Sequence, residues 1–231
     1  AYGHDLGHTP FGHAGEAALT DVTGKPFRHN EQSLRVVDRL ERDGAGLNLT
    51  YEVRMAILGH TGDFIPETLE GQVVRASDRI AYINHDIDDA MRAGILKESD
   101  IPREIADILG HSHSERINTL VMDMIDHTAE TGTLGMRPEV AAAMDELRKF
   151  MFARVYTNPV AKGDESKAKD IIRRLYEYYS KNPMKLPEDF IPQLDFDGMD
   201  RIVCDYIAGM TDRYAVYKFS ELFIPATWQV R

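Results

Sequence analysis

Hydrophobic residues recur every three or four positions along most of the chain, the spacing that places them on one face of an α-helix. This pattern stops near Gly44, Gly62 and Gly132, and Pro138 can begin the helix that follows. Segments in which hydrophobic and polar residues alternate, as they do in β-strands, are nearly absent. The pattern predicts helices over residues 31–43, 50–60, 67–94, 101–110, 112–130, 137–157, 165–181 and 197–220.

The predicted fold class is therefore all-α, a bundle of about eight helices. The chain has 231 residues, of which 43% are hydrophobic and 28% charged, so one sizeable core can form. The sequence contains no internal repeat, low-complexity tract or interdomain linker. A single domain over residues 1–231 is the organisation that this predicts.

Charge and cysteine content narrow the classes of function. The net charge of −11 argues against nucleic-acid binding, which needs clustered lysines and arginines. A nucleoside triphosphate is still a suitable ligand, because a metal ion and a few local cations can hold it. Without an apolar run of about 18 residues or a secretory signal, no membrane span is expected. The single Cys204 rules out an intramolecular disulfide and fits a cytoplasmic protein.

The first sixteen residues concentrate side chains that bind metals or transfer protons: His4, Asp5, His8, His13 and Glu16. Glycines between them allow the backbone and a substrate to approach closely. Imidazole and carboxylate groups together suit a divalent metal ion. A single histidine is more often a core or surface residue, but the density of histidines here favours a metal-binding or catalytic segment.

A second polar pattern lies within the predicted helix 67–94. Five side chains share one stripe of that helix, because they are four, seven, eight and eleven positions from the first: Asp78, Tyr82, His85, Asp86 and Asp89. Such a stripe can be a solvated helix face or one side of a site. The spacing alone leaves both interpretations open.

The segment from His4 to Glu16 closely resembles the motif of HD-domain phosphohydrolases, in particular the deoxyguanosine triphosphate triphosphohydrolase-like branch. Four further segments resemble the same branch, at residues 29–33, 57–62, 76–90 and 205–215. The resemblance extends over essentially the whole chain. It implies an HD-domain helical bundle that hydrolyses deoxynucleoside triphosphates (dNTPs) at the α-phosphorus, releasing deoxynucleoside and inorganic triphosphate.

The resemblance also implies roles for individual residues. It makes His4, Asp5 and Asp78 ligands of a divalent ion, Mn²⁺ or Mg²⁺ before Fe²⁺, Ni²⁺ or Zn²⁺. It makes His13 a proton donor or phosphate-directed catalyst with Glu16 as its orienting partner.

His29 is a third candidate catalytic residue, in a segment that lies near the phosphates in relatives; the alternative is a cap or surface histidine. His8 and Arg79 are expected to contact the phosphates, although His8 can instead support the metal ligands and Arg79 can form an exposed ion pair. Tyr82 would pack against the deoxyribose, and Asp86 would accept a hydrogen bond from its 3′-hydroxyl.

The resemblance predicts a missing part as well. Relatives carry a further metal-binding histidine on an earlier helix, so the chain is expected to lack its first helices. Relatives often form homo-oligomers, and some are activated by a nucleotide effector. A homo-oligomer with a dNTP substrate, and no nucleic-acid or membrane partner, is the resulting expectation.

Two other functions are compatible with the sequence. One is a different HD-type nucleotide phosphohydrolase, such as a 5′-nucleotidase or a cyclic-nucleotide phosphodiesterase. The other is a non-catalytic nucleotide-sensing module. Among the remaining features, the apolar cluster around residues 150–156 is expected to build the scaffold, and so is His60. Asp212 and Arg213 either form an internal ion pair or line the pocket.

Overall fold

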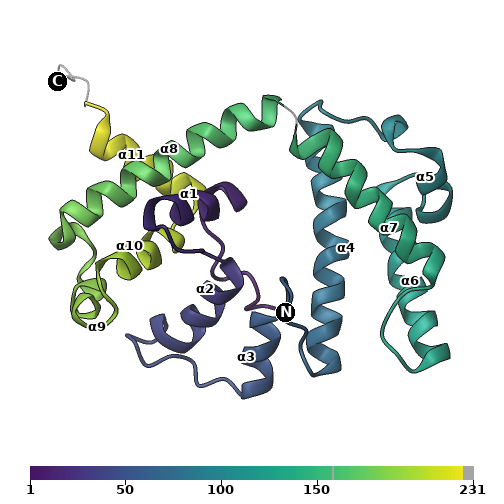
Figure 1. Ribbon diagram of the computed structural model, residues 1–231, viewed down its shortest axis with the longest axis horizontal. Helices are drawn as coiled ribbons and strands as arrows, with labels where there is room; N and C mark the ends of the chain where they lie inside the picture. Colours follow the sequence, from purple (N-terminus) through teal and green to yellow (C-terminus); the bar gives the residue numbers. More distant parts are fainter. Residues whose placement is uncertain (158, 226–231) are drawn as a thin grey trace, which may run out of the picture. The chain divides into compact units, whose positions relative to one another are not determined.

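The computed structural model describes residues 1–157 and 159–225, and in this part of the chain it contains eleven α-helices and no strand (Figure 1). The all-α fold class predicted from the sequence is confirmed. Contacts divide the chain into two compact units. The first unit comprises Ala1–Leu58 and Gly163–Arg231, and the second comprises Gly59–Lys162. The single domain expected from the sequence stays a prediction.

The first unit brings the beginning and the end of the chain into one core. Its helices are α1 (His13–Thr23), α2 (His29–Arg35), α3 (Tyr51–Leu58), most of α8 (Pro159–Lys181), α9 (Leu194–Asp197), α10 (Met199–Ala208) and α11 (Asp212–Phe223). Leu19 of α1, Ile172 and Leu175 of α8, and Ile202 and Ile207 of α10 are fully buried in the same cluster. The early segment that carries the histidines is therefore anchored on late helices.

The second unit is built around one long helix, α4 (Leu69–Arg92), with α5 (Arg103–Leu109), α6 (His113–Thr131) and α7 (Pro138–Met151). The side chain of Thr68 caps α4 by accepting a hydrogen bond from the Gly71 N–H at 3.2 Å. Ile80, Ile83 and Ile87 are buried at helical spacing, so one face of α4 packs into the core. The opposite face carries the polar stripe.

Several predicted helix boundaries agree with the structure, and others do not. The predicted helix 67–94 corresponds to α4, but the predicted helix 197–220 is two helices, α10 and α11. The break follows Gly209, and the Thr211 side chain caps α11 by accepting from the Tyr214 N–H. The predicted helices 31–43 and 137–157 end in π-helical turns, Val36–Leu40 and Phe152–Tyr156.

Helix α1 was not predicted as a helix. Its eleven residues include few large hydrophobic side chains, so the periodic signal is weak, and only Gly15, Ala18 and Leu19 are buried. The described part of the chain contains no helix that is long and apolar enough to cross a membrane.

Candidate active site

Close backbone packing brings the first histidines onto α2 in the first unit. A Cβ atom at Gly7 would lie 2.2 Å from the Ser33 nitrogen and 2.4 Å from the His29 carbonyl oxygen, so only glycine fits here. The Gly7 N–H donates to the Ser33 hydroxyl at 2.9 Å. The segment that carries His4, Asp5 and His8 therefore lies directly against the beginning of α2, where His29 is the first residue.

A tight turn over residues 9–12 then places His13. The Thr9 hydroxyl donates to the Gly12 carbonyl at 2.8 Å, and a Cβ atom at Gly15 would lie 2.2 Å from the Pro10 carbonyl oxygen. Phe11 and Gly12 both have positive φ angles, 63° and 56°. α1 begins at His13 immediately after this turn, so the turn sets the position of that side chain.

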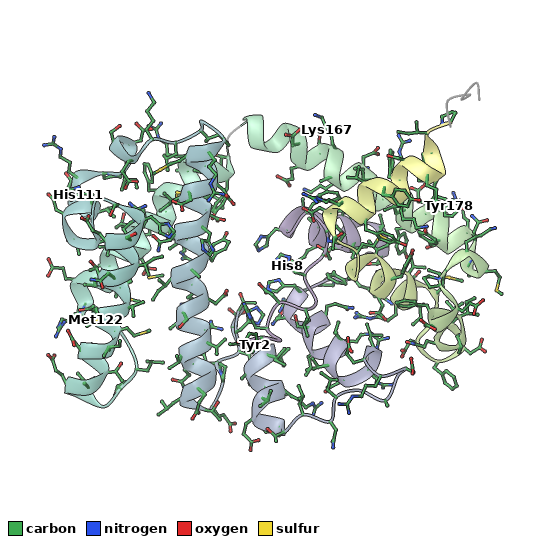
Figure 2. The ribbon with its side chains drawn as sticks, turned by 180° about the vertical axis from the view of Figure 1, so that it is seen from behind. Tyr2, His8, His111, Met122, Lys167 and Tyr178 are labelled. Carbon is green, nitrogen blue, oxygen red and sulfur yellow. The ribbon has the colours of Figure 1, made fainter. Side chains whose placement is uncertain are left out.

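Three imidazole rings from three segments meet in this unit. The His8 side chain, which comes from the loop before α1 (Figure 2), stacks on His29 with ring centroids 4.6 Å apart and an interplanar angle of 24°. His13 meets both rings edge-on, at 5.9 Å from His8 and 6.2 Å from His29. Burial and the neighbouring charge of His29 lower the pKa of His8, which favours its neutral form.

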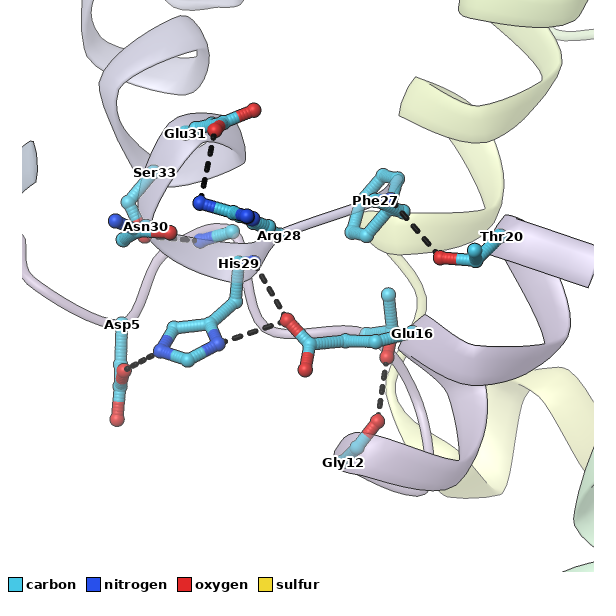
Figure 3. A network of polar contacts seen from close by, with 12 residues as sticks. Asp5, Gly12, Glu16, Thr20, Phe27, Arg28, His29, Asn30, Glu31 and Ser33 are labelled. Carbon is cyan, nitrogen blue, oxygen red and sulfur yellow. Dashed lines mark hydrogen bonds and ion pairs between the residues drawn. The ribbon is translucent and has the colours of Figure 1, made fainter. Parts of the chain in front are cut away.

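Glu16 of α1 binds His29 twice. One of its carboxylate oxygens accepts from the His29 backbone N–H at 2.5 Å and lies 2.8 Å from the ring Nδ1 (Figure 3). Burial opposes ionisation of Glu16, but the hydrogen bonds and charge of His29 outweigh it, and the pKa of Glu16 is lowered. An ionised carboxylate only accepts hydrogen bonds, so the His29 proton is on Nδ1. The lone pair of a neutral His29 is then on Nε2.

Asp5 stands on the far side of the His29 ring (Figure 3). Its Oδ1 is 3.8 Å from His29 Nε2, and its Oδ2 is 3.4 Å from His4 Nε2. His4 Nδ1 is 2.6 Å from the carbonyl oxygen of Ala1, which can only accept, so the lone pair of a neutral His4 is also on Nε2. Two imidazole nitrogens thus face the two oxygens of one carboxylate, an arrangement that a shared cation stabilises.

The donor set in this unit fits a divalent metal ion. Asp5, His8 and His29 each offer one ligand atom within 4.8 Å of the others. Nitrogen and carboxylate donors suit Mn²⁺, Fe²⁺, Ni²⁺ and Zn²⁺, and a carboxylate behind a metal-facing histidine, as Glu16 is behind His29, is usual at metal sites. His4 contacts the same Asp5 carboxylate, and the choice among these donors stays a prediction.

A buried carboxylate of α10 forms hydrogen bonds with side chains of α2. Asp205 of α10 has a side chain with no exposed surface. Its Oδ1 accepts from Gln32 at 2.8 Å, and its two oxygens accept from Arg35 Nε at 3.0 and 2.9 Å. Arg201 Nη2 lies 3.0 Å from Asp205 Oδ1. Asp197 accepts a hydrogen bond from Arg35 Nη2 at 2.6 Å. The helix that begins with His29 is therefore tied to the end of the chain.

The second unit carries the other candidate residues on α4: Asp78, Arg79, Tyr82 and Asp86. Tyr82 is 41% exposed, Arg79 is exposed, and Asp78 and Asp86 are half-buried. His60, expected to be structural, is buried at 1% exposure. Several roles stay predictions. These are the orientation of His13 by Glu16, Asp78 as the third metal ligand, and the contacts of His8 and Arg79 with the substrate.

Tyr156 lies in the apolar segment 150–156, which is expected to build the scaffold, but it also makes a polar contact. Its hydroxyl donates to the carboxylate of Asp86 and lies 2.8 Å from the Tyr82 hydroxyl. Burial raises the pKa of both phenols, and the negative charge of Asp86 adds to this, so both stay protonated near neutral pH. Seventy residues separate Tyr156 from Asp86 in the chain, and no motif in the sequence links them.

Two known families match parts of this chain. Residues 1–83 match the HD domain, and residues 134–221 match the phosphohydrolase-associated domain. The class of the protein is therefore an HD-domain phosphohydrolase, as the sequence motif predicted.

Curated relatives make the assignment narrower. A deoxyguanosinetriphosphate triphosphohydrolase-like protein of Caldanaerobacter subterraneus is 50% identical over 99% of this chain and 67% of its own length. Proteins of the same name from Clostridium tetani and Clostridium perfringens are 45% and 46% identical, each over 97% of this chain and 68% of their own. The chain belongs to this deoxyguanosinetriphosphate triphosphohydrolase-like family, and it spans about two thirds of the length of these relatives.

Proposed function

We propose that this protein is a metal-dependent dNTP triphosphohydrolase, which converts dGTP or several dNTPs to deoxynucleoside and inorganic triphosphate. The observation that carries the proposal is the arrangement of Glu16, His29 and Asp5, in which a half-buried carboxylate orients an imidazole toward a second carboxylate beside His4. The names of the relatives support the choice of substrate.

His4 and Asp5 would hold the metal ion, with Asp78 as the third ligand predicted from the sequence; Mn²⁺ or Mg²⁺ is the proposed ion. When bound, the ion polarises a phosphoryl oxygen and lowers the pKa of a bound water. The lone pair on His4 and the charge on Asp5 are donors that suit it.

The histidines of the first unit would handle protons and phosphate. His13 is exposed at the first position of α1, and it would donate a proton to the departing 5′-oxygen of the nucleoside. His8 is favoured as a neutral imidazole, which can donate one N–H to a phosphate oxygen. Glu16 would keep His29 in the tautomer whose Nε2 faces the reacting groups.

In the second unit, Tyr82 and Asp86 would recognise the sugar. The exposed ring of Tyr82 offers a face to the deoxyribose, and Asp86 can accept a hydrogen bond from the 3′-hydroxyl. Tyr156 donates to Asp86 and so fixes the direction of its carboxylate. Close packing of the tyrosine on the sugar would exclude a 2′-hydroxyl. Arg79, one residue after Asp78, would contact the polyphosphate.

The test is analysis of the phosphate products. The purified protein is incubated with each dNTP and Mn²⁺ or Mg²⁺, and the products are separated by ion chromatography and identified by phosphorus NMR. We expect inorganic triphosphate in amounts equal to the deoxynucleoside. Asp5→Ala should abolish its release. Asp21→Ala, which removes an exposed carboxylate of α1, is the matched control and should retain activity.

Each other outcome contradicts the proposal in a different way. Release of orthophosphate would show an HD-type hydrolase that acts on a different phosphate bond. Thermal stabilisation by dNTPs without any turnover would identify a nucleotide sensor. Triphosphate release that survives Asp5→Ala would contradict the metal site while leaving the reaction in place.

A further inference from the structure

Asp212, the first residue of α11, makes a contact that none of the roles described above uses. Its Oδ1 accepts a hydrogen bond from the backbone N–H of Phe11 at 2.9 Å, and the two residues are 201 positions apart in the chain. Both belong to the first unit. Of the two interpretations left open by the sequence, an internal ion pair or a pocket wall, this contact matches neither, because its partner is the main chain of the turn before His13.

The turn that Asp212 holds is unfavourable by itself. Phe11 has a φ angle of 63°, a region that residues with a Cβ atom rarely adopt, and Gly12 follows with φ 56° and ψ −131°. Thr9 stabilises the inner side of the turn by donating to the Gly12 carbonyl. Asp212 supplies an acceptor for the outward N–H of the strained residue. A carboxylate acceptor makes a stronger hydrogen bond than a neutral one.

The position of Asp212 is itself well fixed. The Thr211 side chain caps the same helix at the Tyr214 N–H, and Ala215 one turn later is fully buried. The preceding helix α10 is tied to α2 through Asp205 and Arg35. The carboxylate is therefore presented to the turn from the first residue of a capped helix that packs into the core.

We infer that Asp212 is a positioning residue, which holds the Phe11–Gly12 turn in its left-handed conformation and thereby aims His13 at the other two imidazoles. His13 directly follows the turn, so any change in the turn rotates the start of α1 and moves its ring relative to His8 and His29. This inference rests on the proposed function for the role of His13. The contact itself does not depend on that function.

Three variants separate positioning from simple stabilisation of α11. Asp212→Ala removes the acceptor and the charge, whereas Asp212→Asn removes the charge and keeps an acceptor oxygen of the same shape. Thr211→Ala removes the cap of α11 and leaves the contact to Phe11 in place. A loss of helix stability affects all three variants, but a loss of the acceptor affects only the first.

A misplaced proton donor slows the chemical step more than it weakens substrate binding. Asp212→Ala should lower kcat by about tenfold or more and leave KM within about twofold, because His13 acts in the transition state and not in substrate binding. Asp212→Asn should restore most of kcat, and Thr211→Ala should leave it near wild type. Equal losses in Asp212→Ala and Thr211→Ala, or no rescue by asparagine, would overturn the inference.

A second measurement does not need catalysis. Hydrogen exchange of the Phe11 amide, followed by NMR in protein labelled with ¹⁵N-phenylalanine, should be about tenfold faster or more in Asp212→Ala and unchanged in Thr211→Ala. Unchanged exchange in Asp212→Ala, in a protein that releases triphosphate, would refute the positioning role alone. Faster exchange in a protein that releases no triphosphate would keep the contact and refute the proposed function.

Discussion

The first unit buries a carboxylate and the second buries a guanidinium, and the two charges are compensated differently. Asp205 in the first unit, with no exposed side-chain surface, accepts from Gln32 and Arg35 and has Arg201 at 3.0 Å. Arg116 in the second unit is also fully buried, but it pairs with Glu98, which is 41% exposed, and with Asn84 at 3.2 Å. Its Nη2 has no hydrogen-bond partner among the described residues.

The difference in the number of polar partners corresponds to the elements that each buried charge contacts. The network of Asp205 connects α10 to α2, where a strained turn and several separate segments must meet at His29. Arg116 supports α4, a single continuous helix whose polar residues share one face because of helical geometry. The buried charge that joins separate segments thus has three polar partners, whereas the buried charge beside the single helix α4 has two.

Removing the two charges should give unequal losses of stability. We expect Asp205→Leu to lower the free energy of unfolding by about 3–5 kcal/mol, since two arginines then lose a buried partner. Arg116→Met should cost about 1–3 kcal/mol, because Glu98 can be hydrated and only Asn84 loses a buried partner. Urea unfolding followed by circular dichroism measures both. Equal costs, or the reverse order, would break the comparison.

Gly7→Ala tests the close backbone packing that holds the histidine segment of the first unit against α2. The added methyl group would meet backbone atoms of Ser33 and His29, so we expect a loss of about 1–3 kcal/mol in stability. Displacement of the histidine segment should also reduce kcat by about 100-fold. Gly163→Ala in α8 is the matched control, because nothing lies within 4 Å of its Cβ position. That variant should be about 0.5–1 kcal/mol more stable than wild type.

Tyr156→Phe tests the support that the second unit gives to Tyr82 and Asp86, the residues proposed to bind the sugar. Loss of the hydroxyl that donates to Asp86 should lower kcat/KM for dNTPs about tenfold, equivalent to ~1.4 kcal/mol. Tyr176→Phe is the control, because Tyr176 donates to Asp200 at 2.7 Å within the first unit. The control should lose a similar amount of stability without a change in kcat/KM. A similar loss of kcat/KM in both variants would argue against a specific role for Tyr156.

The smallest effect should come from Asp197, at the edge of the Asp205 network. Its hydrogen bond to Arg35 lowers the pKa of the Asp197 carboxyl. A lowered folded-state pKa adds stability that is present above the ordinary carboxyl pKa and lost as pH falls through the folded-state pKa. Asp197→Asn should therefore cost about 0.2–1 kcal/mol at pH 7 and less at pH 3. Asp189→Asn, which changes an exposed carboxylate of the preceding 3-10 helix, is the control for the loss of one surface charge.

Most of the second unit could be predicted from its sequence. The isoleucines of α4 and the polar residues opposite them follow one helical period, so the helix and its two faces were expected within two residues at each end. Tyr156 could not be predicted. It was grouped with its apolar neighbours, and a π-helical turn at the end of α7 places its hydroxyl at Asp86. Sequence periodicity carries no signal for such a contact.

In the first unit, the motif identified the residues but not how they are joined. The resemblance paired Glu16 with His13, and that pairing stays a prediction; the structure adds hydrogen bonds between Glu16 and His29. That contact depends on how closely the backbone at Gly7 and Gly15 approaches neighbouring segments. The sequence shows glycines at these positions but not which segments they pack against. Gly209 and Thr211 end one helix and begin the next, a boundary that the apolar pattern alone extends across.

Arg75 has a consequence for how this protein can change over evolutionary time. Its guanidinium donates to the carbonyl oxygens of Gly59, Gly62 and Phe64, at 2.8, 2.6 and 3.2 Å. The Arg75 side chain thus fixes the course of the loop at residues 59–64. It does so by binding carbonyl oxygens, which every amino acid possesses. Mutations at exposed positions such as Asp63 leave these acceptors intact, so lineages can diversify this surface while the loop keeps its course.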